Sequence, residues 1–271
     1  MDADAHQADV EAWREGRYAA LQRDLGWLTL VGLDWLRPGP NRVGTAAGAD
    51  VVLPAGPPVV GVIEVADDGT ATATGAWSHE GTLVDHLPMT DDADGDPTLL
   101  ELGDLRQCLI RRGGRPALRT WNLASAARRA FAGVPHWPVD PAWRLEGRLR
   151  ETPGTTIRVP DVLGVDEDRT SPGEVELEIA DETYRLQALE GGPTGELWLV
   201  FADATNGGET YGGGRFLYTA TPDGDGRVVV DFNRSYNPPC VFTAHATCPL
   251  PWQANRLPIR VEAGERMPAS P

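Results

Sequence analysis

The sequence contains no lysine. All 24 basic residues are arginine, against 40 aspartates and glutamates, which gives a formal net charge of -16. A surface this acidic repels phosphate backbones and anionic lipids, so we expect neither nucleic-acid nor membrane binding. Two explanations fit the composition, a genome of high GC content or a salt-loving host with an acidic proteome. The large negative charge favours the halophile.

Long apolar runs and cysteines are also scarce. No stretch approaches the ~18 apolar residues of a membrane helix, and the first twenty residues are acidic where a signal peptide would be basic and then apolar. We therefore expect a cytoplasmic protein. The three cysteines form an odd set, so we expect reduced thiols and no disulfide framework. A chain of 271 residues can bury a core without such staples.

The first region, residues 1–26, carries the pattern of one amphipathic helix. Val10, Trp13, Tyr18 and Leu21 recur at intervals of three to five residues between residues 4 and 24. We expect the helix to end at Gly26. Its apolar stripe is expected to pack on the domain that follows, with a partner-binding helix as the alternative.

The remainder is typical of β-structure. Over 27–122, short apolar runs are broken by Gly, Pro and Asp at about the 8–12-residue spacing of an antiparallel sandwich, with hairpin turns expected at 67–69 and 112–114. Residues 123–147 form a Pro- and Trp-rich connector, and strands resume over 148–266. The sequence therefore predicts a mainly β protein with an N-terminal helix, a β-sandwich and a second antiparallel β domain, either a barrel or a sandwich.

The sandwich region resembles a degenerate forkhead-associated (FHA) domain. The likeness rests on Gly-Pro-Asn-Arg-Val-Gly at 39–44, on Ser-His-Glu-Gly-Thr at 78–82, and on the segments 50–54 and 100–104. That family reads phosphothreonine through an arginine and an asparagine, and this chain has Thr45 and Glu80 at those positions. A glutamate repels a phosphate dianion, so the resemblance implies the fold without the phosphopeptide activity.

The segment 201–258 differs from the rest because polar residues and prolines crowd its loops. Rigid polar loops on a β scaffold are where sites are usually built. Guanidinium forks, amphipathic rings and amides suit a carboxylate, a phosphate or a polyol. The candidate ligand-binding residues are Arg215, Arg234, Arg256, Tyr211, Tyr236, Asn233, Asn237 and Asn255. The alternative is that each arginine pairs with a nearby acid and pins the loop.

Two further kinds of chemistry are open to the same segment. For catalysis, His245, Asp231 and Asp203 are the acid–base candidates and Cys240 the nucleophile, although no Gly-x-Ser-x-Gly elbow is present. A minor alternative is zinc on Cys240, His245 and Cys248, whose spacing is close to that of zinc ligands, although a second ligand cluster is missing. Otherwise we expect no cofactor.

The chain as a whole resembles the family known as domain of unknown function 1684. The matching motifs are at 13–14, 26–28, 32–33, 138–144, 203–205, 210–218, 231–240, 246–251 and 255–258. The resemblance implies no established reaction. We expect a pocket for a small anionic or polar molecule in the 148–266 domain, with hydrolysis as one use of it. The alternative is a non-enzymatic protein-docking module made of the FHA-like domain and the N-terminal helix.

Overall fold

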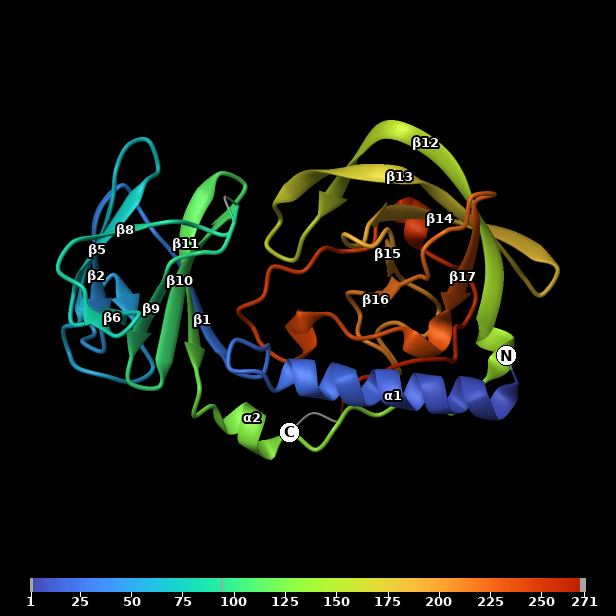
Figure 1. The fold of residues 1–271 in the computed structure, drawn as a ribbon, viewed down its shortest axis with the longest axis horizontal. Coiled ribbons are helices and arrows are strands. Elements are labelled where there is room, and N and C mark those ends of the chain that lie inside the picture. Colours follow the sequence, from blue (N-terminus) through green and yellow to red (C-terminus); the bar gives the residue numbers. More distant parts are fainter. Residues whose placement is uncertain (1, 94, 269–271) are drawn as a thin grey trace. The chain divides into compact units, whose positions relative to one another are not determined.

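A computed structural model describes residues 2–93 and 95–268 and divides the chain into two compact units (Figure 1). The C-terminal unit comprises the described residues of 1–19, 132–241 and 247–271, and the sandwich unit comprises those of 20–131 and 242–246. Strands dominate both units, which confirms the expected mainly β class with an N-terminal helix. Among the described residues, no helix combines the length and apolar character needed to cross a membrane.

The sandwich unit is built from two sheets, in which every pair of neighbouring strands is antiparallel except β2 and β3. One sheet has the order β1-β11-β10-β9-β6-β7, with β1 Leu30–Trp35, β6 Ser78–His79, β7 Thr82–Leu83, β9 Leu99–Leu102, β10 Leu105–Arg112 and β11 Arg115–Asn122. The other has the order β3-β2-β4-β5-β8, with β2 Gly39–Gly44, β3 Val51–Val52, β4 Gly61–Val65, β5 Ala71–Gly75 and β8 Leu87–Met89.

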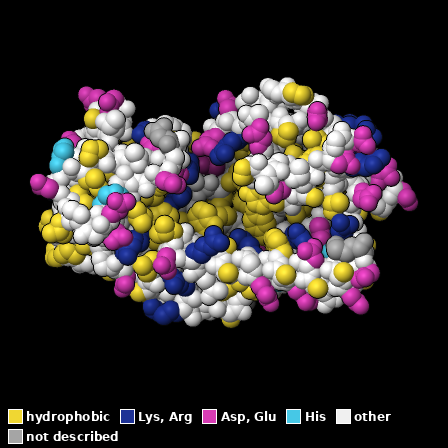
Figure 2. Space-filling model, in the orientation of Figure 1, with side chains coloured by type: hydrophobic (Ala, Val, Ile, Leu, Met, Phe, Trp, Pro, Cys, Tyr) yellow, Lys and Arg dark blue, Asp and Glu magenta, His cyan; other side chains and the backbone are white. Residues whose placement is uncertain are grey.

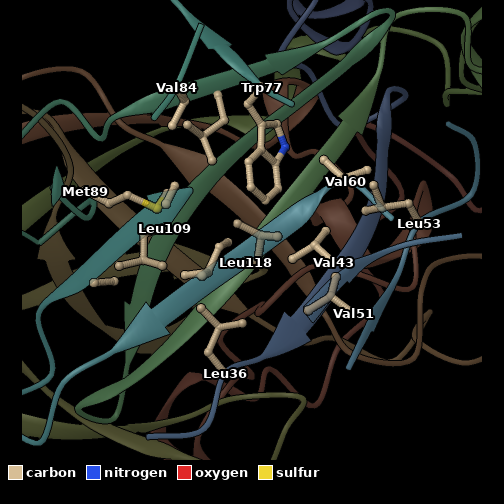
Figure 3. Packing of buried hydrophobic residues seen from close by; sticks show 14 of the residues in the cluster. Leu36, Val43, Val51, Leu53, Val60, Trp77, Val84, Met89, Leu109 and Leu118 are labelled. Atoms are coloured by element: carbon tan, nitrogen blue, oxygen red, sulfur yellow. The ribbon is translucent and has the colours of Figure 1, made fainter. Parts of the chain in front are cut away.

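Side chains from both sheets meet in one apolar core (Figure 3). Val43 of the smaller sheet and Leu109 and Leu118 of the larger one belong to the same buried cluster. The two expected hairpin turns are confirmed, because β4 and β5 pair across the first and β10 and β11 across the second. Gly69, with φ of 85°, and Gly114, with φ of 74°, supply the positive φ that these turns require.

The C-terminal unit contains a six-stranded antiparallel sheet of order β16-β15-β14-β13-β12-β17. Its strands are β12 Arg144–Pro160, β13 Asp166–Ile179, β14 Glu182–Glu190, β15 Leu197–Phe201, β16 Arg215–Tyr218 and β17 Arg227–Asp231. The long strands β12 and β13 arch over the rest of the unit, so that the sheet forms a half-barrel (Figure 1). The concave side holds a core that includes Leu177, Leu186, Phe201 and Val230.

The N-terminal helix α1, Ala3–Leu21, is one element of the C-terminal unit through residue 19. Val10 is fully buried, and the Trp13 ring lies 6.4 Å from that of Tyr236. Val10 and Trp13 of the expected apolar stripe therefore belong to the C-terminal unit, whereas Leu21, at the end of the helix, is buried and belongs to the sandwich unit. The helix also ends at Leu21, before Gly26, which belongs to the turn that redirects the chain.

Short helical turns punctuate the loops. They are α2 Ala126–Ala130, η1 Pro141–Trp143, η2 Phe232–Arg234, η3 Pro239–Val241 and η4 Gln253–Asn255. In η1, the Asp140 carboxylate accepts a hydrogen bond from the Ala142 N–H and caps the turn. Strand β12 starts directly after it, inside the range expected to be a connector.

In the face drawn in Figure 2, acidic side chains are spread over the surface of both units among fewer arginines.

Candidate functional site

Arg215, the first residue of β16, is sealed inside the C-terminal unit. Its side chain is fully buried, and it donates to Asp203 Oδ2 at 2.7 Å and to the Val261 carbonyl at 2.8 Å. It also donates to the Ala263 carbonyl. Burial lowers the pKa of Arg215, and the charge of Asp203 opposes that shift. This arginine has no face open to a ligand. Its hydrogen bonds instead tie β16 to residues 261–265, here called the C-terminal segment.

The three candidate asparagines brace loops in a similar way, because each has no solvent exposure. Asn255 Nδ2 donates to the carbonyls of Gln187 and Val200, both at 2.9 Å, and its Oδ1 accepts from the Gln187 N–H. Asn233 and Asn237 bond to backbone groups of Asp140 and Arg266 in the same manner. Buried loop backbone needs such partners, and these amides therefore serve the fold.

A second buried acid, Glu265, completes this polar interior. Burial raises the pKa of the Glu265 carboxyl, while Arg17 opposes the rise. Glu265 accepts from Arg17 Nε at 3.2 Å and from the Asn237 N–H at 2.7 Å. Arg17 also lies over the Tyr236 ring at 4.6 Å. Helix α1 is thus held to the C-terminal segment by charge as well as by apolar packing.

Asp231 has a histidine partner, but it is one that the sequence analysis did not name. His6 of α1 places Nε2 2.6 Å from Asp231 Oδ2, although the two residues lie 225 positions apart. Asp231 Oδ1 accepts from the Asn233 N–H and side-chain amide. His6 is 2% exposed, and its Nδ1 has no hydrogen-bond partner among the described residues. Both oxygens of Asp231 are therefore occupied by protein groups.

The remaining ligand candidates are scattered. Arg234 pairs with Asp9 of α1, and the exposed Arg256 donates to the Pro251 carbonyl at 3.0 Å. Tyr211 packs over Gly213, where a Cβ would come within 2.4 Å of the tyrosine ring. Burial raises the pKa of Tyr211. The structure therefore does not gather the three arginines around one hollow.

The catalytic candidates are divided between the units. Asp203, Asp231 and Cys240 belong to the C-terminal unit, whereas His245 belongs to the sandwich unit, where its N–H donates to Thr243 Oγ1 at 3.2 Å. Over residues 2–93 and 95–268, no group of three or more His, Cys, Asp or Glu side chains is arranged to hold a metal ion. Within the described part of the chain, the cysteines of the proposed zinc set form no disulfide.

An open depression of about 310 Å³ lies in the C-terminal unit, beside the end of β16 and the loop that leads from β16 to β17. Tyr218, the last residue of β16, is 45% exposed and contributes its ring. The full lining is Asp9, Arg144, Glu196, Tyr218, Thr219, Ala220, Thr221, Val229, Asp231 and Arg234. Two candidates from the sequence analysis, Asp231 and Arg234, thus line this hollow, and its lining does not include Arg215 or Arg256.

Tyr218 belongs to a stack of aromatic rings. Trp198 of β15 is its cross-strand partner, and their rings lie 6.1 Å apart with 16° between the planes. The Tyr236 ring also lies 6.1 Å from the Tyr218 ring, with 14° between the planes. Burial raises the pKa of Tyr236 well above its usual value. Because both neighbours hold it, the exposed Tyr218 ring is a rigid surface.

Charge in the depression is only partly neutralised. Arg234 pairs with Asp9, and Asp231 is bound to His6. Arg144, the first residue of β12, forms no ion pair among the described residues. Hydrogen bonds from the Thr194 hydroxyl and from the backbone N–H of Glu196 itself lower the pKa of the Glu196 carboxyl. An available guanidinium and an ionised carboxylate therefore lie in the same hollow as the Tyr218 ring.

A family model described as a protein of unknown function (DUF1684) matches residues 129–266, just over half of the chain. The chain belongs to the DUF1684 family. The sequence resemblance had implied a match over the whole chain, but the family model matches only residues 129–266. Among solved structures, an uncharacterized protein of Haloarcula marismortui, determined in solution by NMR, has 27% identity and a TM-score of 0.43. The similarity covers 52% of this chain and 79% of that one. No curated protein matches.

The DUF1684 match contains every residue that lines the depression except Asp9. Tyr218 and Trp198 were available to sequence reasoning, because period-two alternation on β15 and β16 places paired aromatic residues on one face. His6, Asp9 and Arg144 carry no such signal. Their relevance depends on how the helix and β12 pack in this DUF1684 protein.

Proposed function

We propose that the C-terminal unit of this DUF1684 protein binds a small polyhydroxylated molecule that carries one anionic group, in the depression beside Tyr218. The observation that carries the proposal is the exposed Tyr218 ring, held rigidly and located in one hollow with the unpaired Arg144 guanidinium. A volume of about 310 Å³ suits a ligand the size of a single sugar ring.

The chemistry of the lining supports this ligand class. The exposed part of the Tyr218 ring offers an apolar surface with a polar hydroxyl at its edge, and the apolar face of a sugar ring packs well against such a surface. A guanidinium donates two parallel hydrogen bonds to a carboxylate or phosphate. The Glu196 carboxylate and the Thr221 hydroxyl, which both line the hollow, are hydrogen-bonding partners for ligand hydroxyls.

Binding fits the site better than hydrolysis. Asp231 is the only one of the four catalytic candidates in the lining, and both its oxygens accept hydrogen bonds from His6 and Asn233. A general base needs an oxygen within reach of the proton that it removes. The residues at this site support recognition of the ligand without a chemical step.

The test is a calorimetric titration of the protein with glucuronate, glucose and acetate. Glucuronate combines the ring with the anionic group and is expected to bind more tightly than either of the others. Tyr218→Ala and Arg144→Ala should each weaken glucuronate binding at least about tenfold, which corresponds to ~1.4 kcal/mol.

The matched control is Arg158→Ala, which removes another arginine of β12, one that pairs with Asp166 on the surface. It should leave glucuronate binding unchanged. Absence of binding by all three compounds, or glucuronate binding that both Tyr218→Ala and Arg144→Ala leave intact, would contradict the proposal.

We further propose that the sandwich unit is an FHA-like domain without phosphothreonine recognition. Support comes from Thr45, whose hydroxyl donates to the Gly56 carbonyl, and from Glu80, which occupies the turn between β6 and β7 with φ of 50°. Neither residue supplies the cationic fork that a phosphate requires. Titration with phosphothreonine peptides is expected to give no binding, and saturable binding at low micromolar concentration would contradict this assignment.

A further inference from the structure

Two of the three cysteines lie against each other in the C-terminal unit. The backbone N–H of Cys240 donates to Cys248 Sγ at 3.2 Å, and the two side chains share a hydrogen bond. Only seven residues separate Cys240 from Cys248 in the sequence. The third cysteine, Cys108, is buried in the sandwich unit.

Each of the paired cysteines has its own anchor. Cys240 belongs to the turn η3, which is closed by the hydrogen bond from the Val241 N–H to the Pro238 carbonyl at 3.0 Å. Cys248 is held by the turn between β12 and β13, because its carbonyl accepts from the Val162 N–H at 3.0 Å. The proximity of the two sulfurs is therefore built into the backbone.

The two thiols differ in accessibility and acidity. Cys240 is partly exposed, whereas Cys248 is buried. The hydrogen bond that Cys248 donates lowers the pKa of Cys240, and the same bond, with burial, raises the pKa of Cys248. This asymmetry is typical of a dithiol in which the outer sulfur attacks an oxidant and the inner sulfur resolves the product.

We propose that Cys240 and Cys248 form an oxidisable dithiol that closes to an intrachain disulfide when the protein meets a hydroperoxide. The pair lies outside the Tyr218 depression, and the disulfide would form a loop that encloses residues 241–247. Residues 242–246 within this loop are the ones that belong to the sandwich unit.

The reaction balances with two thiols and one hydroperoxide. The Cys240 thiolate attacks the terminal peroxide oxygen, the O–O bond breaks, and Cys240 becomes a sulfenic acid while water or an alcohol leaves. The Cys248 sulfur then attacks the Cys240 sulfur, the S–S bond forms, and hydroxide leaves with the Cys248 proton as water. Two electrons pass from the thiols to the peroxide.

Loss of the Cys240 negative charge favours the second step. The hydrogen bond to Cys240 and its charge are two of the three largest causes that raise the pKa of Cys248, and burial is the other. The Coulombic cause disappears once Cys240 is a neutral sulfenic acid, and a hydrogen bond to this neutral group is weaker than one to a thiolate. Cys248 therefore becomes a better nucleophile at the moment when its partner becomes an electrophile.

Tryptic peptides separate the Cys240–Cys248 pair from Cys108, since arginine is the only tryptic cleavage residue in the chain. Cys240 and Cys248 share the peptide 235–256, whereas Cys108 lies in the peptide 107–111. The reduced full-length protein would be treated with hydrogen peroxide, unfolded in the presence of iodoacetamide, digested and weighed by mass spectrometry.

The expected result is a 235–256 peptide that takes up no iodoacetamide and has lost the mass of two hydrogen atoms. Burial raises the pKa of Cys108 to about 12, so its peptide should be fully alkylated and at least about tenfold slower to oxidise. In Cys248→Ser, Cys240 should accumulate as a sulfenic acid that dimedone traps. In Cys240→Ser, Cys248 should remain an alkylatable thiol.

Three results would overturn the proposal. One is a wild-type 235–256 peptide that still carries two alkylated cysteines when Cys108 has been oxidised. Another is oxidation of wild-type Cys240 to the sulfinic acid without any disulfide. The third is a disulfide that joins two separate chains. The wild-type readout stands even if one of the serine variants fails to fold.

Discussion

Arg215 and Arg144 are each the first residue of a strand in the same sheet, yet their surroundings differ completely. Arg215 is fully buried against Asp203 and two backbone carbonyls. Arg144 lines an open hollow without an ion pair among the described residues. The polar residues of the C-terminal unit thus divide into an interior network that stabilises loops and a small surface site. Residue type alone does not separate the two groups.

The largest effect is expected from Arg215→Met. This change leaves the Asp203 carboxylate buried without its partner, which should lower the free energy of unfolding by about 3–5 kcal/mol. Urea denaturation monitored by circular dichroism would measure it. Arg158→Met, at an exposed ion pair, is the matched control and should cost less than about 0.5 kcal/mol. A loss below about 1 kcal/mol for Arg215→Met would place Arg215 outside the stabilising network.

An intermediate effect is expected from His136, which forms a β-bridge with Glu265 of the interior network and has the Tyr18 hydroxyl 3.3 Å from its Nδ1. Burial, followed by the charge of Arg14, lowers the pKa of His136 from 6.5 to about 4. The unfolded chain therefore takes up this proton near pH 6.5 and the folded protein only near pH 4. Stability should fall as the pH falls through that window, by roughly 2–3 kcal/mol.

The measurement is urea denaturation at several pH values between 7 and 4, for the wild type and for His136→Gln. The variant cannot take up the proton, so its free energy of unfolding should decline less steeply over the window. Parallel pH profiles for the two proteins would show that His136 is solvated in the folded state and would remove it from the interior network.

The smallest effect is expected at the rim of the depression. Arg234 and Asp9 form an ion pair between partly exposed side chains, and a double-mutant cycle with alanine should give a coupling energy of about 0.2–1 kcal/mol. The coupling should weaken further in 1 M salt. A coupling energy above about 2 kcal/mol would mean that this rim pair stabilises the protein as strongly as a buried pair, and would contradict the proposed difference between the rim and the interior network.

Local patterns in the sequence identified much of the fold. The spacing of Val10 and Trp13 indicated α1, and the glycines at 69 and 114 marked hairpins that the structure contains. The polar richness of 201–258 was also a correct observation. Its interpretation as a converged site was not supported, because Asn233, Asn237 and Asn255 are buried against backbone groups.

The sequence by itself determined where the helix, the strands and the turns lie, since each depends on residues a few positions apart. Only the tertiary structure decided that α1 lies on the C-terminal segment, that Asp231 meets His6, and that Tyr218 rather than Arg215 faces solvent. These outcomes depend on contacts between residues as far as 248 positions apart. Burial and electrostatics acting across such distances leave no periodic trace in the chain.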